Sequence, residues 1–188
     1  MVCNCKVYDK CIRRGDMYSK FNYSAGILLY MQMDNTLHVL LGKDVKYDLW
    51  SDLGGRSEET DRGDRIKTAC REFFEESMGV ISDEYDLRYN VKHKSICFEC
   101  DTYKKNIYYM FMVDASRLVA NRDVVEDFYY QQLMLGKTRS NTISKFKEKS
   151  KLGWFSVDYI IDNPILFREV FYRGLIQHIH KIRKCVFV

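Results

Sequence analysis

Three glutamates in a segment with helical periodicity carry the most chemical information in this chain. Glu72, Glu75 and Glu76 are spaced i, i+3 and i+4, so at about 100° per residue they lie on one flank of a helix. Like charges at this spacing destabilise a helix unless a cation lies beside them. Carboxylates suit Mg²⁺ and Mn²⁺, so the spacing indicates a divalent-cation site. The alternative is an exposed acidic face balanced by Lys and Arg.

A glycine pair before this helix favours the metal interpretation. Gly54 and Gly55 let the backbone approach where a Cβ would clash, so that a carbonyl there can join a metal's ligands. Arg56 follows directly and can bind a phosphate oxygen bidentately. A glycine loop followed at short range by Arg-Glu-x-x-Glu-Glu at residues 71–76 is far more specific than either feature alone.

Together these residues resemble the signature of the Nudix hydrolases. That signature runs Gly, five residues, Glu, seven residues, Arg-Glu-apolar-x-Glu-Glu-x-Gly-apolar. Gly55 opens it here, residues 71–76 match its centre and Gly79-Val80 close it. Trp50 stands where the family often has a tryptophan, and residues 154–158 resemble the family's last strand. The resemblance covers residues 24–180, although only residues 50–80 are specific.

The chain departs from the signature in length at both ends of the helix. The loop between Gly55 and Arg71 is two residues longer. Counting forward from Gly55 therefore puts the intermediate glutamate at Asp61, and counting back from Arg71 puts it at Gly63. One extra residue also follows Glu76. Loops and helix ends tolerate insertions, and the three glutamates are intact, so an active enzyme is expected.

The resemblance implies a pyrophosphohydrolase that needs Mg²⁺ or Mn²⁺ and cleaves a nucleoside-diphosphate-type linkage. It implies metal ligands at the carbonyl of Gly55 and at Glu72, Glu75 and Glu76. It also implies catalytic roles for Glu72, Glu76 and Arg71, with Arg71 holding a glutamate by a charge-assisted hydrogen bond.

The general base is open at this point. Glu72 or Glu76 could deprotonate the attacking water, and relatives also use a carboxylate from a distant loop. Glu126 and Asp127 are the candidates for that role here. The alternative for both is an exposed helix start.

Charge and aromatic residues bear on the substrate. Residues 137–184 hold eleven Lys/Arg and four Asp/Glu, a net of +7, and the remainder has a net of −3. A basic segment suggests a polyanionic partner, although a solvated helix face is the alternative. Tyrosines and phenylalanines that could stack a methylated guanine are Tyr103, Tyr108, Phe128, Tyr129 and Tyr130. The alternative for each is an ordinary core or surface residue.

We therefore expect a nucleotide or capped RNA as the substrate, with mRNA decapping as the specific hypothesis. Trp50 and Arg56 are the substrate-binding candidates near the signature. Lys181, Arg183 and Lys184 are the candidates on the last helix, where they could follow a phosphate backbone.

Three other functions compete with decapping. The first is a small-molecule pyrophosphatase acting on nucleotide sugars, nucleoside triphosphates, dinucleoside polyphosphates or inositol pyrophosphates. The second is a nucleotide-binding module that has lost activity, against which the intact glutamates argue. The third, nucleic-acid binding without chemistry, explains the basic segment but not the glutamates. The sequence leaves the oligomeric state open.

Length and composition indicate the number of domains and the class of protein that contains these residues. The 188 residues, 46% hydrophobic and 30% charged, predict one domain over 1–188, with a Cys-containing N-terminal extension at 1–20 and a basic C-terminal segment at 137–184. The longest apolar run, residues 25–30, is far short of the roughly 20 residues that a membrane helix needs. Residues 1–23 lack the apolar core of a signal peptide. A cytoplasmic protein without a membrane partner is expected.

The periodicity predicts strands alternating irregularly with helices. Strands are expected at 24–32 and 37–42 around a turn at 33–36, then a loop at 50–64 and a helix at 65–78 ended by Gly79. Further strands are expected at 91–99, 106–113 and 152–157, a helix at 124–135 and a last helix from Pro164 to about Lys184. This order favours an α/β (α+β) fold. The resemblance specifies a Nudix-type α/β/α sandwich with a mixed central sheet.

Seven cysteines cannot all pair with one another. Without an export signal they are expected to be reduced thiols, and no structural zinc is expected. Two clusters nevertheless suggest zinc as the alternative, and Cys3, Cys5 and Cys11 form the first. Cys97 and Cys100 form another, but residues three apart on a strand point to opposite faces and cannot share a zinc ion.

Overall fold

The computed structural model describes residues 23–101, 106–118, 123–136, 146 and 148–186. The strands are β1 (Tyr23–Met33), β2 (Thr36–Asp44), β3 (Trp50–Ser51), β4 (Leu53–Arg56), β5 (Ile96–Asp101), β6 (Ile107–Asp114) and β7 (Lys149–Ser156). The α-helices are α2 (Arg65–Glu76), α3 (Glu84–Lys94), α4 (Val124–Gly136), α5 (Val157–Asp162) and α6 (Glu169–Val186). Short 3₁₀ helices are η1 (Glu59–Asp61), η2 (Ala115–Arg117) and η4 (Pro164–Leu166).

The strands form one mixed sheet of seven strands within the described residues. Its order is β3-β2-β1-β6-β5, with β4 paired to β1 and β7 paired to β2. β1 runs parallel to β6 and antiparallel to both β2 and β4. Because β1 pairs with β2 through one half and with β4 through the other, the glycine pair on β4 is fixed to the centre of the sheet.

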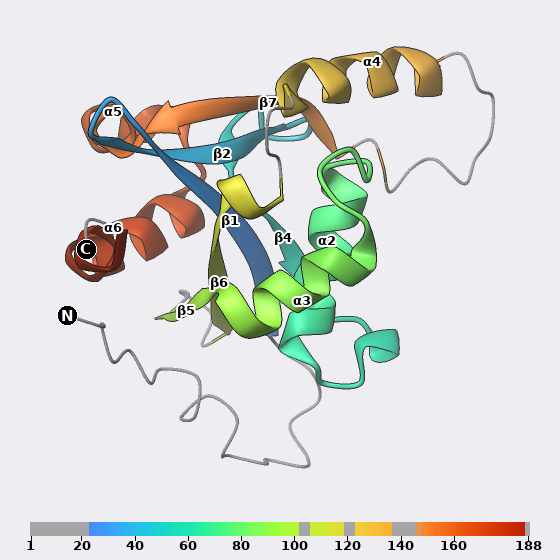
Figure 1. The fold of residues 1–188 in the computed structure, drawn as a ribbon, viewed down its shortest axis with the longest axis horizontal. Helices are drawn as coiled ribbons and strands as arrows, with labels where there is room; N and C mark the ends of the chain where they lie inside the picture. The colour runs from blue at the N-terminus through green and yellow to red at the C-terminus, as the bar shows by residue number, and fades with distance from the viewer. Residues whose placement is uncertain (1–22, 102–105, 119–122, 137–145, 147, 187–188) are drawn as a thin grey trace.

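Helices cover both faces of the sheet (Figure 1). Successive residues of β1 point to opposite sides: Ile27 and Leu29 join the core beneath α2 and α3, and Leu28 joins the core beneath α5 and α6. The first core also receives Phe128 from α4. The expected sandwich of helices around a mixed sheet, in an α+β arrangement, is therefore confirmed.

The first hairpin follows the prediction closely. Asp34 and Asn35 have φ angles of 47° and 60°, and Met33 pairs with Thr36. Positive φ at both central residues of a two-residue turn matches the right-handed twist of the flanking strands. Asn and Asp tolerate this conformation better than most residues.

The predictions for two elements are wrong. The loop predicted at 50–64 contains β3, β4 and η1, because pairing with β1 and β2 turns a glycine-rich segment into strand. The strand predicted at 91–99 begins only at Ile96, and residues 91–94 belong to α3. α3 buries only Leu87 and Val91 along an otherwise polar helix, so its apolar periodicity was too sparse to recognise.

The later helices also differ in detail from the prediction. A short helix, α5, precedes Pro164, and Pro164 begins the 3₁₀ turn η4. The last α-helix then starts at Glu169 and reaches Val186.

The described cysteines fit their expected positions. Cys97 lies in the core beneath α2 and Cys100 in the core beneath α6, so the prediction that they point to opposite faces is confirmed. Cys70, Cys100 and Cys185 are free thiols. Cys3, Cys5 and Cys11 lie outside the described residues. No helix in the described part of the chain is long and apolar enough to cross a membrane.

Candidate active site

The glycine pair on β4 is shaped by what lies on its two sides. Gly54 pairs with Gly26 of β1, and a Cβ at Gly54 would lie 2.5 Å from the Gly26 Cα. A Cβ at Gly55 would lie 2.5 Å from the Glu72 Cδ. Glycine at these positions therefore lets β4 pack on β1 and lets the Glu72 carboxylate rest directly on the backbone.

α2 presents the signature residues to this strand. The Asp64 side chain caps its first turn by accepting hydrogen bonds from the amides of Ile66 and Lys67. Ala69, Cys70 and Phe73 are buried against the sheet. With this face fixed, Arg71, Glu72, Glu75 and Glu76 lie toward β4 and the turn that precedes α2.

The extra residues around α2 are accommodated by left-handed backbone. Arg62 and Gly63, between η1 and the cap of α2, have φ angles of 52° and 78°. Met78 and Gly79, after the helix, have φ angles of 55° and 68°. Both insertions thus lie outside the segment that carries the glutamates.

Arg71 organises the site. Its Nε and Nη2 donate to the two carboxylate oxygens of Asp61 at 3.2 and 3.0 Å, and Nη2 also donates to the Arg56 carbonyl at 2.9 Å. Nη1 lies 2.9 Å from Glu72 Oε1 and 3.4 Å from Glu75 Oε2. One guanidinium therefore joins η1, the end of β4 and the glutamate face of α2.

Asp61 binds Arg71, although counting along the sequence did not distinguish it from Gly63 as the equivalent of the intermediate glutamate. It is fully buried and also accepts hydrogen bonds from the Glu58 amide and the Thr68 hydroxyl, both at 2.9 Å. Burial alone would raise the pKa of Asp61, but hydrogen bonds from Arg71, the Glu58 amide and Thr68 bring it below its usual range. Of the two positions left open by counting, Gly63 and Asp61, the structure places Asp61 on Arg71.

Glu72 lies in a strongly negative environment. Burial raises the pKa of Glu72 to about 7, and the charges of Glu75 and Glu148 act in the same direction, against the lowering effect of Arg71. Glu148, immediately before β7, was not among the sequence candidates because nothing in its local sequence marks it. The structure brings it within electrostatic reach of Glu72. Glu126 and Asp127 instead occupy the first turn of α4.

Glu76 is directed away from Glu75 and into the protein. Its Oε2 accepts a hydrogen bond from the Gly54 amide at 2.7 Å, and its Oε1 lies 3.1 Å from the Lys149 ammonium. Burial raises the pKa of Glu76 to about 8, although Lys149 and the Gly54 amide lower it. Glu72 and Glu75 thus contact Arg71, whereas Glu76 contacts Lys149.

The donor chemistry fits a hard divalent cation. Among the described residues, no three His, Cys, Asp or Glu side chains are already grouped around one point as a metal ion would need. Four carboxylates nevertheless lie within 3.6 Å of the single guanidinium of Arg71, those of Glu58, Asp61, Glu72 and Glu75. This excess of negative oxygen donors beside the half-buried backbone of Gly54 and Gly55 is suited to Mg²⁺ or Mn²⁺.

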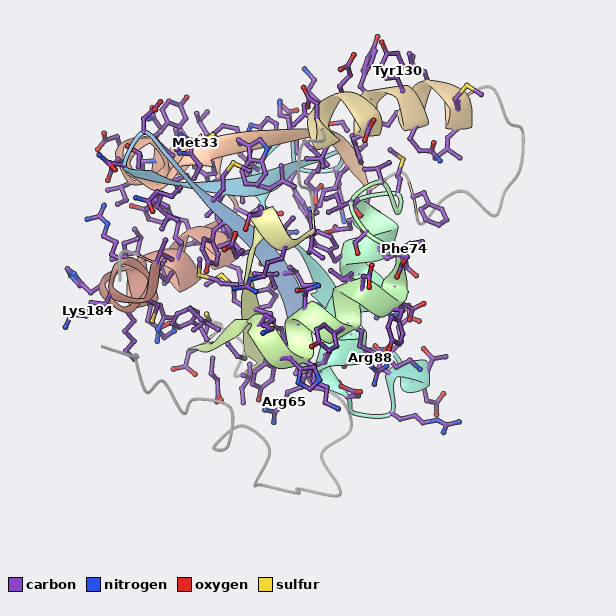
Figure 2. All side chains as sticks on the ribbon, in the orientation of Figure 1. Met33, Arg65, Phe74, Arg88, Tyr130 and Lys184 are labelled. Atoms are coloured by element: carbon purple, nitrogen blue, oxygen red, sulfur yellow. The ribbon has the colours of Figure 1, made fainter. Side chains whose placement is uncertain are left out.

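The substrate-binding candidates are scattered over the molecule. Arg56 is exposed at the end of β4, beside Arg71. Trp50 packs on Phe155 with ring centroids 4.7 Å apart, in the core beneath α6. Lys184 projects from α6 on the side of the molecule away from Phe74 of α2 (Figure 2). Lys181, Arg183 and Lys184 are exposed, and Arg183 pairs with Asp158 at 2.6 Å.

The aromatic candidates fall into three groups. Tyr108 and Phe128 are buried, and the Tyr108 hydroxyl donates to Asp52. Tyr129 and Tyr130 are exposed on α4, with Tyr130 projecting outward (Figure 2). Tyr103 and most of the basic segment 137–147 lie outside the described residues. Among the described candidates, only Tyr129 and Tyr130 of α4 thus have exposed rings on which a base could stack.

No protein-family model and no curated protein matches this chain. Several solved structures are similar to it. A MutT/Nudix family protein from Listeria innocua has a TM-score of 0.47 at 12% identity, covering 90% of this chain and 98% of its own. An Ap4A hydrolase from C. elegans, solved as a binary complex, has a TM-score of 0.46 at 14% identity, covering 85% and 98%. The Nudix domain of NrtR from Shewanella oneidensis, solved with ADP ribose, has a TM-score of 0.44 at 12% identity, covering 96% and 97%. At these values the similarities do not assign an activity, which must be inferred from this chain's own residues.

Proposed function

We propose that this protein is a Nudix-type pyrophosphohydrolase that depends on Mg²⁺ or Mn²⁺. The observation that carries the proposal is the Arg71 arrangement: a guanidinium anchored on buried Asp61 holds Glu72 against the Gly55 backbone, with Glu75 on the same nitrogen. A helix of ordinary acidic residues would leave these side chains in solvent. Here the buried carboxylate of Asp61 binds the arginine through both of its oxygens.

The residues that would hold the metal are the Gly55 carbonyl, Glu72, Glu75 and Glu76. When bound, the metal supplies neutralisation of the negative charge on the diphosphate oxygens. Arg71 keeps Glu72 and Glu75 side by side despite their repulsion. Arg56, exposed one residue from the glycine pair, is placed to bind a phosphate oxygen of the substrate.

Two carboxylates can take the proton of the attacking water. Glu72 is the first candidate: its carboxylate lies against the Gly55 backbone, and in the metal-free protein burial raises its pKa to about 7. Glu148 is exposed and near enough to Glu72 for their charges to interact. We favour Glu148 over Glu126 and Asp127 as the carboxylate supplied from a distant segment, since the charge of Glu148 acts on Glu72.

The substrate class that we favour is an RNA 5′ cap, so that the reaction is mRNA decapping. The basic α6, the basic segment before β7 and the exposed tyrosines of α4 support it. A small-molecule pyrophosphatase is the alternative. It is favoured by the position of α6 on the face of the sheet opposite α2, which separates the basic residues from the glutamates. A nucleotide-binding module without activity is the third possibility.

The test is a screen for hydrolysis of capped RNA, nucleotide sugars, dinucleoside polyphosphates and inositol pyrophosphates, with and without Mg²⁺ or Mn²⁺. Glu75→Gln should lower turnover at least a hundredfold, since it removes a ligand charge while Arg71 keeps its other partners. Glu59→Gln, an exposed acid of η1 outside this set, is the matched control and should be fully active. Turnover without metal, or an active Glu75→Gln variant, would contradict the proposal.

A further inference from the structure

The buried lysine at the start of β7 is a feature that the signature does not explain. The side chain of Lys149 is completely buried, although it belongs to the basic segment 137–184, for which the sequence suggests either a polyanionic partner or a solvated helix face. Its ammonium lies 3.1 Å from Glu76 Oε1 and donates to the Ser51 hydroxyl at 2.9 Å. A second carboxylate, Asp44 of β2, lies 4.0 Å away.

The surrounding sheet is shaped for this side chain. A Cβ at Gly42, on the neighbouring strand β2, would lie 2.9 Å from both Cγ and Cδ of Lys149, so the aliphatic stem occupies the space that a glycine leaves. A fully buried ammonium loses its hydration and requires charged or polar partners. Well-packed apolar residues often give equal stability, so a buried lysine here calls for a role beyond packing.

The contacts of Lys149 define what it does to Glu76. The Gly54 amide binds Oε2 and Lys149 binds Oε1, so the carboxylate is held at both oxygens between β4 and β7. Asp44 is in turn 3.5 Å from Arg168 and accepts from the amides of Lys46 and Tyr47. Asp44 is therefore a second, fixed counter-ion that keeps Lys149 in place when the charge of Glu76 is shared with another cation.

We propose that Lys149 is a positioning residue that orients Glu76 for its part in the metal site. The inference rests on the proposed function for the identity of that site. It adds a residue from β7, far from the signature in sequence, whose only action on the reaction is through Glu76. Outer contacts of this kind typically change metal affinity or activity 10–100-fold.

The experiment is a double-mutant cycle with Lys149→Met, Glu76→Gln and the double variant. Lys151→Met, an exposed lysine on the same strand, is the matched control and should behave as the wild type. In the metal-free protein, Lys149→Met should lower the melting temperature by leaving Glu76 buried without its partner. The double variant should recover at least half of that loss, because both charges are gone.

Metal binding and turnover supply the functional readouts. Lys149→Met should weaken Mn²⁺ binding, measured by calorimetry, about tenfold and lower kcat about a hundredfold with little change in KM. In the Glu76→Gln background it should add less than twofold to either quantity. Ser51→Ala, which removes one neutral partner of the lysine, should give a smaller loss in the same direction and serves if Lys149→Met does not fold.

Equal effects of Lys149→Met with and without Glu76 would overturn the inference, because the lysine would then act as a general structural element. Tighter Mn²⁺ binding in Lys149→Met would also overturn it, because the lysine would then only repel the metal. If no substrate is hydrolysed but Glu76-dependent coupling in Mn²⁺ binding is found, the positioning role stands and the proposed reaction fails.

Discussion

At the scale of single residues, Asp61 determines whether the site forms. It is buried and binds Arg71 through both carboxylate oxygens, so Asp61→Asn leaves the guanidinium without its charged anchor. We expect a loss of about 3 kcal/mol in unfolding free energy and a large loss of turnover, because Glu72 and Glu75 then repel each other. Chemical denaturation and kinetics measure the two effects.

Asp64→Asn is the control for this substitution. Asn caps a helix as well as Asp does, and the Asp64–Arg88 ion pair is largely exposed, so the change should cost less than about 1 kcal/mol. Equal costs at positions 61 and 64 would show that Asp61 has no special role in anchoring Arg71.

The pKa of Glu72 gives a second prediction at this scale. In the metal-free folded protein the pKa of Glu72 is raised from 4.5 to about 7, so the folded state binds this proton more tightly than the unfolded state does. The free energy of unfolding should therefore fall as pH rises from about 4.5 to 7. The slope between pH 5 and 7 should be shallower in Glu72→Gln, and saturating Mg²⁺ should reduce the difference between the two proteins. Identical slopes would contradict the assigned pKa.

The sequence alone named Arg71 and the three helix glutamates as candidates for the proposed site, but it did not show how their side chains group. Helical spacing predicts that Glu72, Glu75 and Glu76 lie on one flank. Glu76 nevertheless binds Lys149, because β7 brings that lysine next to it. The structure makes Glu76 one half of a buried ion pair with Lys149. Contacts with Glu148 and Lys149 depend on tertiary pairing, which spacing within one helix does not contain.

At the scale of elements, the closeness of β4 to α2 is the controlling feature. Gly55→Ala places a methyl group where the Glu72 carboxylate now lies, so Glu72 must move. A displacement of about 1 Å can reduce turnover about a hundredfold, and the fold should survive because the clash is with a flexible side-chain end. Turnover and the melting temperature check both parts.

Gly153→Ala is the matched control for a glycine in the sheet. Its added Cβ would meet ring carbons of Phe155 and Trp50 at 3.1 and 3.3 Å, on the face beneath α6. Activity should therefore be retained. Loss of turnover in both variants would indicate a general effect on the sheet and not the displacement of Glu72.

The elements that sequence patterns failed to predict share a physical reason. β3 and β4 are short and contain glycine, so they owe their conformation to pairing with β1 and β2 and not to local propensity. α3 buries only two of its 11 residues on a largely charged and polar helix. By contrast, β1, β2, α2 and α6 have long apolar periodicities and were predicted to within a few residues.

At the scale of the whole molecule, the sheet separates the glutamate site from the basic helix. Ile27 and Leu28 are neighbours in sequence but belong to the cores beneath α2 and α6 respectively. A small nucleotide bound at α2 is therefore not expected to contact Lys181, Arg183 or Lys184. A capped RNA can reach them only if its chain continues around the edge of the sheet.

Replacing these three residues with glutamine tests which substrate the molecule is built for. All three are exposed on α6, so the fold should be unaffected and hydrolysis of a small nucleotide unchanged. For a capped RNA with a long tail, each lost phosphate contact should flatten the plot of log affinity against log salt by about 0.7. The full change in slope is about 2 for three contacts, and it is smaller if the Arg183–Asp158 pair already neutralises one charge.

Lys92→Gln with Lys94→Gln, on exposed positions of α3, is the control and should leave this slope unchanged. A triple variant with the wild-type slope would show that α6 holds no RNA and would favour the small-molecule pyrophosphatase, since the decapping proposal needs a basic track and the described part of the chain offers α6 for it.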